Sequence, residues 1–287
     1  MIKRDFTVMS EGVELYARLT PAAASAVGTV LLLSGVGFHS FEYEGLEDRL
    51  AAAGFACVAF DYRGHGRSGG ARGKWRLGDL VRDTQAVLDA VRGEITGLTA
   101  VFGNSLGGMV SMSAAVDDAR IAAVAVSNCP ARIADFLMTP ARRLLLGLAE
   151  AVAPILPLRI SVNNFYSYEQ LIDDPIWVQR IRADDLITDA RRLSIKAFRS
   201  LIEDWDGEAM ARRLRKPLLV LQGDRDELQP ASESDLIYAA AHEPKRLIRL
   251  DTGHLPNLEK PDLLAQSLTD WLGETVSAGK APGLAKQ

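Results

Sequence analysis

The most constraining feature of this chain is a series of short apolar runs that recurs along most of its length. A continuous apolar run, unlike an alternating one, is typical of a parallel β-strand that is buried on both faces. The runs therefore predict a central, mostly parallel sheet. They occupy residues 29–34, 56–61, 98–103, 121–127, 217–222 and 246–251.

Stretches with helical spacing separate the first of these runs. They read "FEYEGLEDRLAAAG", "LGDLVRDTQAVLDAVRG" and "LGGMVSMSAAV". Regular alternation of strand and helix predicts an α/β fold with helices on both faces of the sheet. Before the first run, residues 6–19 alternate around a Ser-Glu-Gly turn, which predicts an antiparallel hairpin at the sheet edge.

The alternation stops after the sixth expected strand, where several helical segments are separated by prolines. We expect these segments to form an all-helical cap over one end of the sheet. The expected organisation is a core of residues 1–130 and 214–275, a cap of residues 131–213 and a flexible tail of residues 276–287. The tail is rich in Gly, Ala and Lys, and it lacks periodicity.

Composition excludes several classes of partner. The chain has 33 Lys and Arg against 37 Asp and Glu, a net charge of -4, with no long run of one sign. We therefore expect no nucleic-acid partner.

The amino terminus lacks the apolar stretch of a signal peptide, and no run approaches the roughly 18 apolar residues of a membrane span, so a cytoplasmic location is expected. Cys57 and Cys129 lie in apolar runs, which indicates small buried side chains rather than a metal site or a disulfide.

The stretch "GHGRSGG", residues 64–70, fits two motifs at once. It contains the G-x-G-x-x-G of a dinucleotide-binding turn and the G-x-S-x-G of a serine nucleophile. The first requires a helix that starts at once and an acidic strand end about 20 residues later, and neither is present. Gly73 and Lys74 resemble the end of a phosphate loop, but Trp75 follows where Ser or Thr is needed.

A second G-x-S-x-G, "GNSLG" at residues 103–107, has the context that a nucleophile needs. A random chain of this composition would contain about 0.1 such matches. Here a buried strand runs directly into a helix, which predicts the sharp turn that exposes a serine hydroxyl. We therefore expect Ser105 to be the nucleophile and Ser68 to be a loop residue.

A nucleophilic serine needs a base, and the chain has four histidines. Because the order in α/β hydrolases is Ser, acid, His, His39 and His65 are excluded. His242 ends a helical pattern, as surface histidines often do. His254 follows the last strand and is the expected base. The acid is expected in "GDRDELQP", which offers Asp224, Asp226 and Glu227.

At this point the chain resembles the α/β-hydrolase-fold enzymes. Gly223, Asp226 and Pro230 match their acid motif, and "GHLPNLEKPD" matches their histidine loop. The resemblance covers nearly the whole chain and is closest to the monoacylglycerol lipase and lysophospholipase branch, through "SGVGFHSFEYEGLEDRLAAAGF" and "RSGGARG". It implies that Asp226 is the acid and that "FDYRGHGRSGG" is a scaffold loop.

The resemblance also implies an oxyanion hole formed by the backbone N–H groups of Val36 and Leu106, because "SGVGFHS" corresponds to the H-G-x-G stretch of the family. Two residues depart from the family pattern. Ser34 and Asn104 stand where histidines are usual. Both departures leave the triad intact and bear on the choice of substrate.

We expect a serine hydrolase, needing no cofactor or metal, that cleaves a carboxylic ester through an acyl-enzyme. An apolar small-molecule ester is expected because the cap is rich in apolar residues. A thioesterase or a C–C bond hydrolase with the same triad is the alternative, and a non-catalytic binding module is a third interpretation. The apolar cap residues are 136–138, 143–158, Phe165, Tyr166, Ile176 and Trp177.

Overall fold

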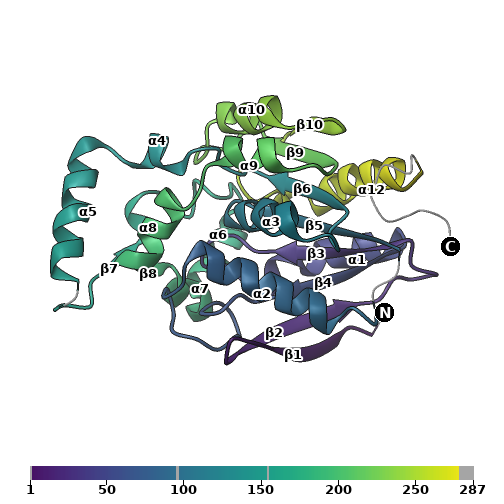
Figure 1. Ribbon diagram of the computed structural model, residues 1–287, viewed down its shortest axis with the longest axis horizontal. Coiled ribbons are helices and arrows are strands. Elements are labelled where there is room, and N and C mark those ends of the chain that lie inside the picture. Colours follow the sequence, from purple (N-terminus) through teal and green to yellow (C-terminus); the bar gives the residue numbers. More distant parts are fainter. Residues whose placement is uncertain (1, 95–96, 154, 278–287) are drawn as a thin grey trace.

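An eight-stranded, mostly parallel sheet forms the centre of the molecule (Figure 1). The computed structural model describes residues 2–94, 97–153 and 155–277. The strand order is β1-β2-β4-β3-β5-β6-β9-β10, in which only the β1–β2 and β2–β4 pairs are antiparallel. The expected strands and edge hairpin are confirmed. They are β1 (Arg4–Ser10), β2 (Val13–Thr20), β3 (Gly28–Leu33), β4 (Phe55–Phe60), β5 (Leu98–Asn104), β6 (Ala123–Ser127), β9 (Leu218–Gly223) and β10 (Lys245–Leu250).

Helices cover both faces of the sheet, as expected. Successive residues of β3 show why its apolar run is continuous, since Leu31 and Leu33 enter one core while Val30 and Leu32 enter the other. One face carries α1 (Glu44–Ala52), α11 (Pro256–Glu259) and α12 (Pro261–Ser277). The other carries α2 (Leu77–Ala90), α3 (Leu106–Asp117), α9 (Gly207–Arg213) and α10 (Ala231–Ala240).

The segment between β6 and β9 contains helices and a small sheet. The expectation of an all-helical cap is wrong here, because β7 (Arg159–Ser161) and β8 (Arg192–Ser194) pair antiparallel. Three-residue strands are too short to produce a recognisable alternation. The remaining elements are α4 (Ile133–Leu137), α5 (Pro140–Val152), η2 (Val162–Asn164), α6 (Pro175–Ala183), α7 (Asp185–Ala190) and α8 (Ile195–Glu203). Figure 1 shows α4, α5 and the β7–β8 pair at one end of the sheet.

Two boundaries of the expected domains can be compared with these elements. Helix α9 packs against α3 and α10 of the core, although its residues fall in the range expected for the cap. Helix α12 continues to Ser277 and buries Thr275, so residues 276 and 277 are helical rather than tail. The rest of the expected tail, 278–287, lies outside the described residues. The division at 131 and 213 remains a prediction.

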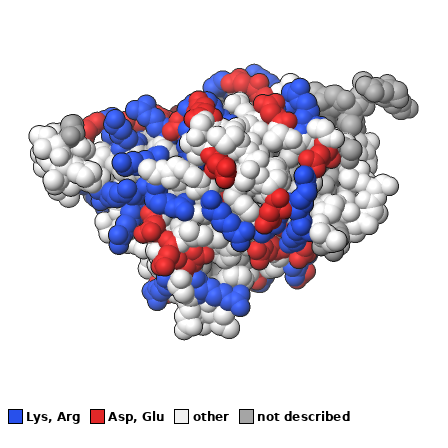
Figure 2. Space-filling model, turned by 90° about the horizontal axis from the view of Figure 1, so that it is seen from below, with Lys and Arg blue, Asp and Glu red and all other residues white. Residues whose placement is uncertain are grey.

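The face in Figure 2 shows both charge signs intermixed, with a mostly uncharged end on the side where Figure 1 places α5. Within the described residues, no helix is both long and apolar enough to cross a lipid bilayer. Cys57 and Cys129 are both buried and unpaired, in agreement with the expectation from the sequence. Exposed apolar residues on and after α5 are Leu144, Leu145, Leu148, Val152, Ile155 and Leu156.

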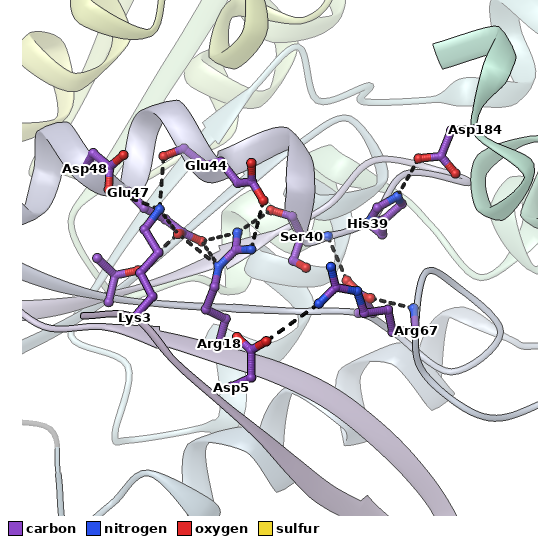
Figure 3. A network of polar contacts seen from close by, with 12 residues as sticks. Lys3, Asp5, Arg18, His39, Ser40, Glu44, Glu47, Asp48, Arg67 and Asp184 are labelled. Atoms are coloured by element: carbon purple, nitrogen blue, oxygen red, sulfur yellow. Dashed lines mark hydrogen bonds and ion pairs between the residues drawn. The ribbon is translucent and has the colours of Figure 1, made fainter. Parts of the chain in front are cut away.

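A polar network fixes the loop that follows β3 (Figure 3). The guanidinium of Arg18 donates to Glu47 of α1 at 2.9 Å and to the carbonyl of Ser40 at 3.0 Å. The backbone N–H of Ser40 donates to Asp61 at 2.7 Å. Because these groups are buried, their hydrogen bonds are well shielded from water. The end of the loop is therefore held from both the sheet and the segment after β4.

The start of the same loop is held by Glu42, which lies in η1 (Ser40–Tyr43) and is fully buried. Its carboxylate accepts hydrogen bonds from the backbone N–H of Gly35 at 3.1 Å and from the side chain of Asn257 at 3.3 Å. Burial raises the pKa of Glu42 to about 7, although these two hydrogen bonds act to lower it, and the nearby Asp61 raises it further.

This raised pKa predicts a pH-dependent stability. Between about pH 4.5 and pH 7 the unfolded chain releases the Glu42 proton while the folded chain keeps it, so the free energy of unfolding falls as pH rises. The decrease should total about 3 kcal/mol. Glu42→Gln should lack it, which urea unfolding at several pH values from 4.5 to 7.5 will measure.

Glu14→Gln is the matched control, because Glu14 is an exposed residue of β2. Its unfolding free energy should follow that of the wild type across the whole range. If the unfolding free energies of the wild type and of Glu42→Gln changed with pH in parallel, Glu42 would ionise normally in the folded chain.

Candidate active site

Ser105 occupies a sharp turn between β5 and α3. Its backbone dihedrals, φ 55° and ψ −117°, are rare for a residue with a side chain. A Cβ on Gly107 would lie 1.8 Å from the carbonyl oxygen of Leu33, and one on Gly103 would lie 2.1 Å from Gly107. Only glycine fits at these two positions. The turn is anchored because the Ser105 N–H donates to the carbonyl of Ser127 at 2.9 Å.

The other G-x-S-x-G serine, Ser68, has a different environment. Its hydroxyl donates to the carbonyl of Asp61 and accepts from the backbone N–H of Tyr16 at 2.8 Å, and the side chain is buried. The Asp61 carboxylate in turn accepts from the backbone N–H of Arg67 at 2.7 Å. The Tyr16 bond ties the loop to β2, and Asp61, which also accepts from the Ser40 N–H, links it to the end of the loop after β3. Both links support the interpretation of "GHGRSGG" as scaffold.

His254 and Asp226 lie in direct contact. Nδ1 of His254 donates to Oδ2 of Asp226 at 2.7 Å, and the two side chains are 4% and 0% exposed. The other carboxylate oxygen accepts the backbone N–H groups of Leu228 and Gln229, each at 2.9 Å. This arrangement fixes the carboxylate and leaves Nε2 of His254 for chemistry. By contrast, Asp224 is exposed.

Ser105 and His254 are not directly hydrogen-bonded in the described part of the chain. They are linked through the end of β6, where Ser127 accepts the Ser105 N–H and Asn128 donates to the His254 carbonyl at 2.9 Å. Catalytic hydrogen bonds in ligand-free sites are often long and shorten only when substrate binds.

The other three histidines have separate environments. His39 contacts Asp184, which lies in the segment between β6 and β9, and the distance from Nε2 to Oδ2 is 2.9 Å. His65 is buried, which lowers its pKa to about 4 although the Arg63 carbonyl acts to raise it. His242 is exposed and bonded to the carbonyl of Arg212, as expected for a surface residue.

The loop after β3 lies against the nucleophile. A Cβ on Gly35 would be 3.9 Å from the Cβ of Ser105. Among the described residues, the backbone N–H groups of Val36 and Leu106 have no hydrogen-bond acceptor. The two departures from the family pattern, Ser34 and Asn104, are both buried.

Arg191, at the end of α7, covers this loop. Its stem packs so closely on Gly37 that a Cβ there would lie 2.2 Å from Cγ of Arg191. The guanidinium lies 5.0 Å from the ring centres of Tyr166 and Tyr168, and its Nε donates to Asn163 at 2.8 Å. Contacts with aromatic faces stabilise a buried cation.

A small apolar cavity lies between Val36 and the helices above it. It has a volume of about 30 Å³. The apolar residues expected in the cap fall into two groups. Leu137, Phe165 and Tyr166 line this cavity, whereas most of the large side chains in the 143–158 run are exposed. The remaining lining residues are Ile133, Val162, Phe198, Leu201 and Ile202.

Sequence reasoning missed two buried polar residues of this region, Glu42 and Asn128. Asn128 directly follows the buried run 121–127 and has a positive φ of 46°. An asparagine at the end of a buried strand, where parallel sheets carry their sites, was the available signal. Glu42 offered no comparable signal, because a charged residue at the start of a helical stretch is usually exposed.

In the described residues, no group of three or more His, Cys, Asp or Glu side chains is arranged to hold a metal ion.

The architecture and the geometry of this site can be compared with known proteins. A family model described as serine aminopeptidase S33 matches residues 24–254. A monoacylglycerol lipase from Mycolicibacterium smegmatis is 31% identical over 215 residues, which are 73% of this chain and 74% of that protein.

Solved structures agree with this match. The monoacylglycerol lipase of Paleococcus ferrophilus has 27% sequence identity and a TM-score of 0.76, and the match covers 92% of this chain and 98% of that one. A monoglyceride lipase from Saccharomyces cerevisiae, with 16% identity and a TM-score of 0.77 over 98% of this chain and 97% of that one, shares the fold. This chain therefore belongs to the serine aminopeptidase S33 family and is a serine hydrolase with the α/β-hydrolase fold, in the branch of the monoacylglycerol lipases.

Proposed function

We propose that this enzyme hydrolyses carboxylic esters with an apolar acyl or alkyl arm, using Ser105 as nucleophile, His254 as base and Asp226 as the orienting acid. The observation that carries the proposal is the 2.7 Å contact between His254 and a fixed carboxylate, next to a strained serine turn. Such a contact holds the imidazole in one tautomer and stabilises the imidazolium that forms during the reaction.

In the first half of the reaction, Oγ of Ser105 attacks the ester carbonyl carbon while Nε2 of His254 takes its proton. The carbonyl oxygen becomes an oxyanion, which the N–H groups of Val36 and Leu106 stabilise. The tetrahedral intermediate collapses, and the alcohol leaves with the proton from the imidazolium. The acyl group remains on Ser105 as an ester.

In the second half, water takes the place of the alcohol. His254 removes a proton from the water as it attacks the acyl carbon, and the same oxyanion site stabilises the second intermediate. Ser105 then leaves with the proton from His254, and the carboxylic acid is released. Asp226 keeps the imidazole of His254 oriented through both halves of the reaction.

The apolar arm is supported by the cavity beside Val36, which the aromatic and aliphatic side chains of α4 and α8 line. It is also supported by the relatives that are named monoacylglycerol lipases. The cavity of about 30 Å³ has room for about two water molecules. An acyl chain of several carbons would therefore extend beyond it. The cytoplasmic location inferred from the sequence remains a prediction.

Replacing Ser105 by alanine should remove the nucleophile without disturbing the fold. We expect kcat for p-nitrophenyl butyrate to fall by about 10⁶-fold, with a near-UV circular dichroism spectrum like that of the wild type.

Ser68→Ala is the matched control, since it alters the other G-x-S-x-G motif. It removes two buried hydrogen bonds and should lower the free energy of unfolding by about 1–3 kcal/mol, while kcat stays within about threefold. If Ser68→Ala were folded and as inactive as Ser105→Ala, the assignment of the nucleophile to the motif of Ser105 would be wrong.

The two aspartates after β9 should differ sharply. Asp226→Asn cannot stabilise the imidazolium and favours the wrong tautomer of His254, so kcat should fall by about 10⁴-fold. Asp224→Asn alters an exposed residue of the same loop and should cost less than tenfold. Steady-state kinetics at pH 7.5 will compare them, and equal losses would contradict the choice of Asp226.

Chain-length preference should report on the cavity. Each buried methylene contributes about 0.8 kcal/mol, or about fourfold in kcat/KM, so kcat/KM should rise from acetate to a medium acyl chain in a p-nitrophenyl ester series. Leu137→Ala enlarges the lining and should move the optimum to longer chains. Leu148→Ala, at an exposed position on α5, should not move it. A steady fall from acetate onward would rule out an apolar acyl site, and a parallel thioester series will compare the two leaving groups.

A further inference from the structure

The end of β6 touches all three segments that carry the proposed triad. The carbonyl of Ser127 accepts the N–H of Ser105 at 2.9 Å. The next residue, Asn128, contacts the other two segments through its side chain. These are the acid loop, residues 223–229, which begins at the last residue of β9, and the base loop, residues 251–255 after β10.

The side chain of Asn128 is fully buried and uses both ends of its amide. Oδ1 accepts the backbone N–H of Gly223 at 2.8 Å, at the start of the acid loop. Nδ2 donates to the carbonyls of Gly253 at 3.2 Å and of His254 at 2.9 Å, in the base loop. An amide can do this because it carries an acceptor and two donors on one planar group.

These bonds act on the proposed triad through the backbone. Gly223 lies three residues before Asp226, and the His254 carbonyl belongs to the proposed base itself. The 2.7 Å contact between Asp226 and His254 requires the two loops to keep their spacing. Other bonds support this spacing, since the Arg225 N–H donates to the Thr252 carbonyl at 3.0 Å and Glu259 accepts from both loops. Asn128 differs from them because it contacts both loops from the end of β6, next to Ser127.

We propose that Asn128 is a positioning residue that sets the spacing of the acid and base loops and the position of His254 relative to Ser105. This inference rests on the triad of the proposed function. Ser127 holds the nucleophile turn, and Asn128 holds the acid and base loops. These two consecutive residues therefore fix all three segments relative to one point, the end of β6. Misplacement of a catalytic group by about 1 Å can cost about 100-fold in rate.

A purely backbone role for Asn128 makes a different prediction. Its φ of 46° lies in the left-handed region, which asparagine tolerates and glycine adopts most readily. If only the backbone conformation mattered, Asn128→Gly would be fully active. If the hydrogen bonds matter, Asn128→Gly would fold and lose activity.

Two variants therefore separate the roles. Asn128→Gly keeps the backbone conformation and removes all three hydrogen bonds. Asn128→Asp also tolerates this conformation and can still accept from Gly223, but it sets a carboxylate oxygen against the two carbonyls. We expect kcat for p-nitrophenyl butyrate to fall by about 10- to 100-fold in Asn128→Gly and by at least as much in Asn128→Asp, with KM within about threefold of the wild type.

Thr252→Val is the matched control. Thr252 lies in the base loop and is buried, and its hydroxyl has no hydrogen-bond partner among the described residues. Removing that hydroxyl should leave kcat within about twofold. Thermal melts and near-UV circular dichroism will establish that each variant is folded at the assay temperature.

The outcomes are distinct. A wild-type enzyme that does not hydrolyse the ester, or a Ser105→Ala variant that retains activity, would overturn the proposed function itself. An active wild type with a fully active Asn128→Gly would overturn only the positioning role. Failure of both Asn128 variants to fold would also overturn it, because Asn128 would then act on the fold as a whole.

Discussion

The close approach of the turn at Ser105 to the end of β3 is the constraint on which the rest of the structure depends. The turn between β5 and α3 passes so near the end of β3 that a single methyl group at Gly107 would collide with the Leu33 carbonyl. This contact brings the loop after β3 against the nucleophile, so that Gly35 lies next to Ser105. The strained φ of Ser105 persists because the surrounding packing holds it.

Buried polar groups complete the arrangement that this packing begins. Glu42 holds the start of the loop after β3, and its second partner, Asn257, belongs to the helix that follows the base loop. Asn128 joins the base loop to the acid loop in the same way. Such bonds are strong in a dry interior, and an unpaired polar group there is costly. The loops at this end of the sheet are therefore fixed more firmly than their lack of regular structure suggests.

Much of the architecture could be predicted from local pattern, and the reason is physical. Strands buried on both faces must be apolar throughout, so the run at 121–127 marks β6 without any knowledge of its neighbours. The turn at Ser105 was predictable because its glycines form one short motif, although the Leu33 carbonyl that excludes a side chain at Gly107 is remote in sequence. The β7–β8 pair was too short to leave a pattern. Asn128 was missed because its partners are remote, the His254 carbonyl lying 126 positions away.

The packing of Arg191 on Gly37 has a consequence for how enzymes of this shape can diverge. Arg191 and the glycine at 37 form a matched pair, although one lies in the segment between β6 and β9 and the other in the loop after β3. A different residue at 191 would leave this loop uncovered or would displace it. The loop after β3 and the segment that carries Arg191 therefore fit each other at this contact, and a change at either position has to be matched at the other.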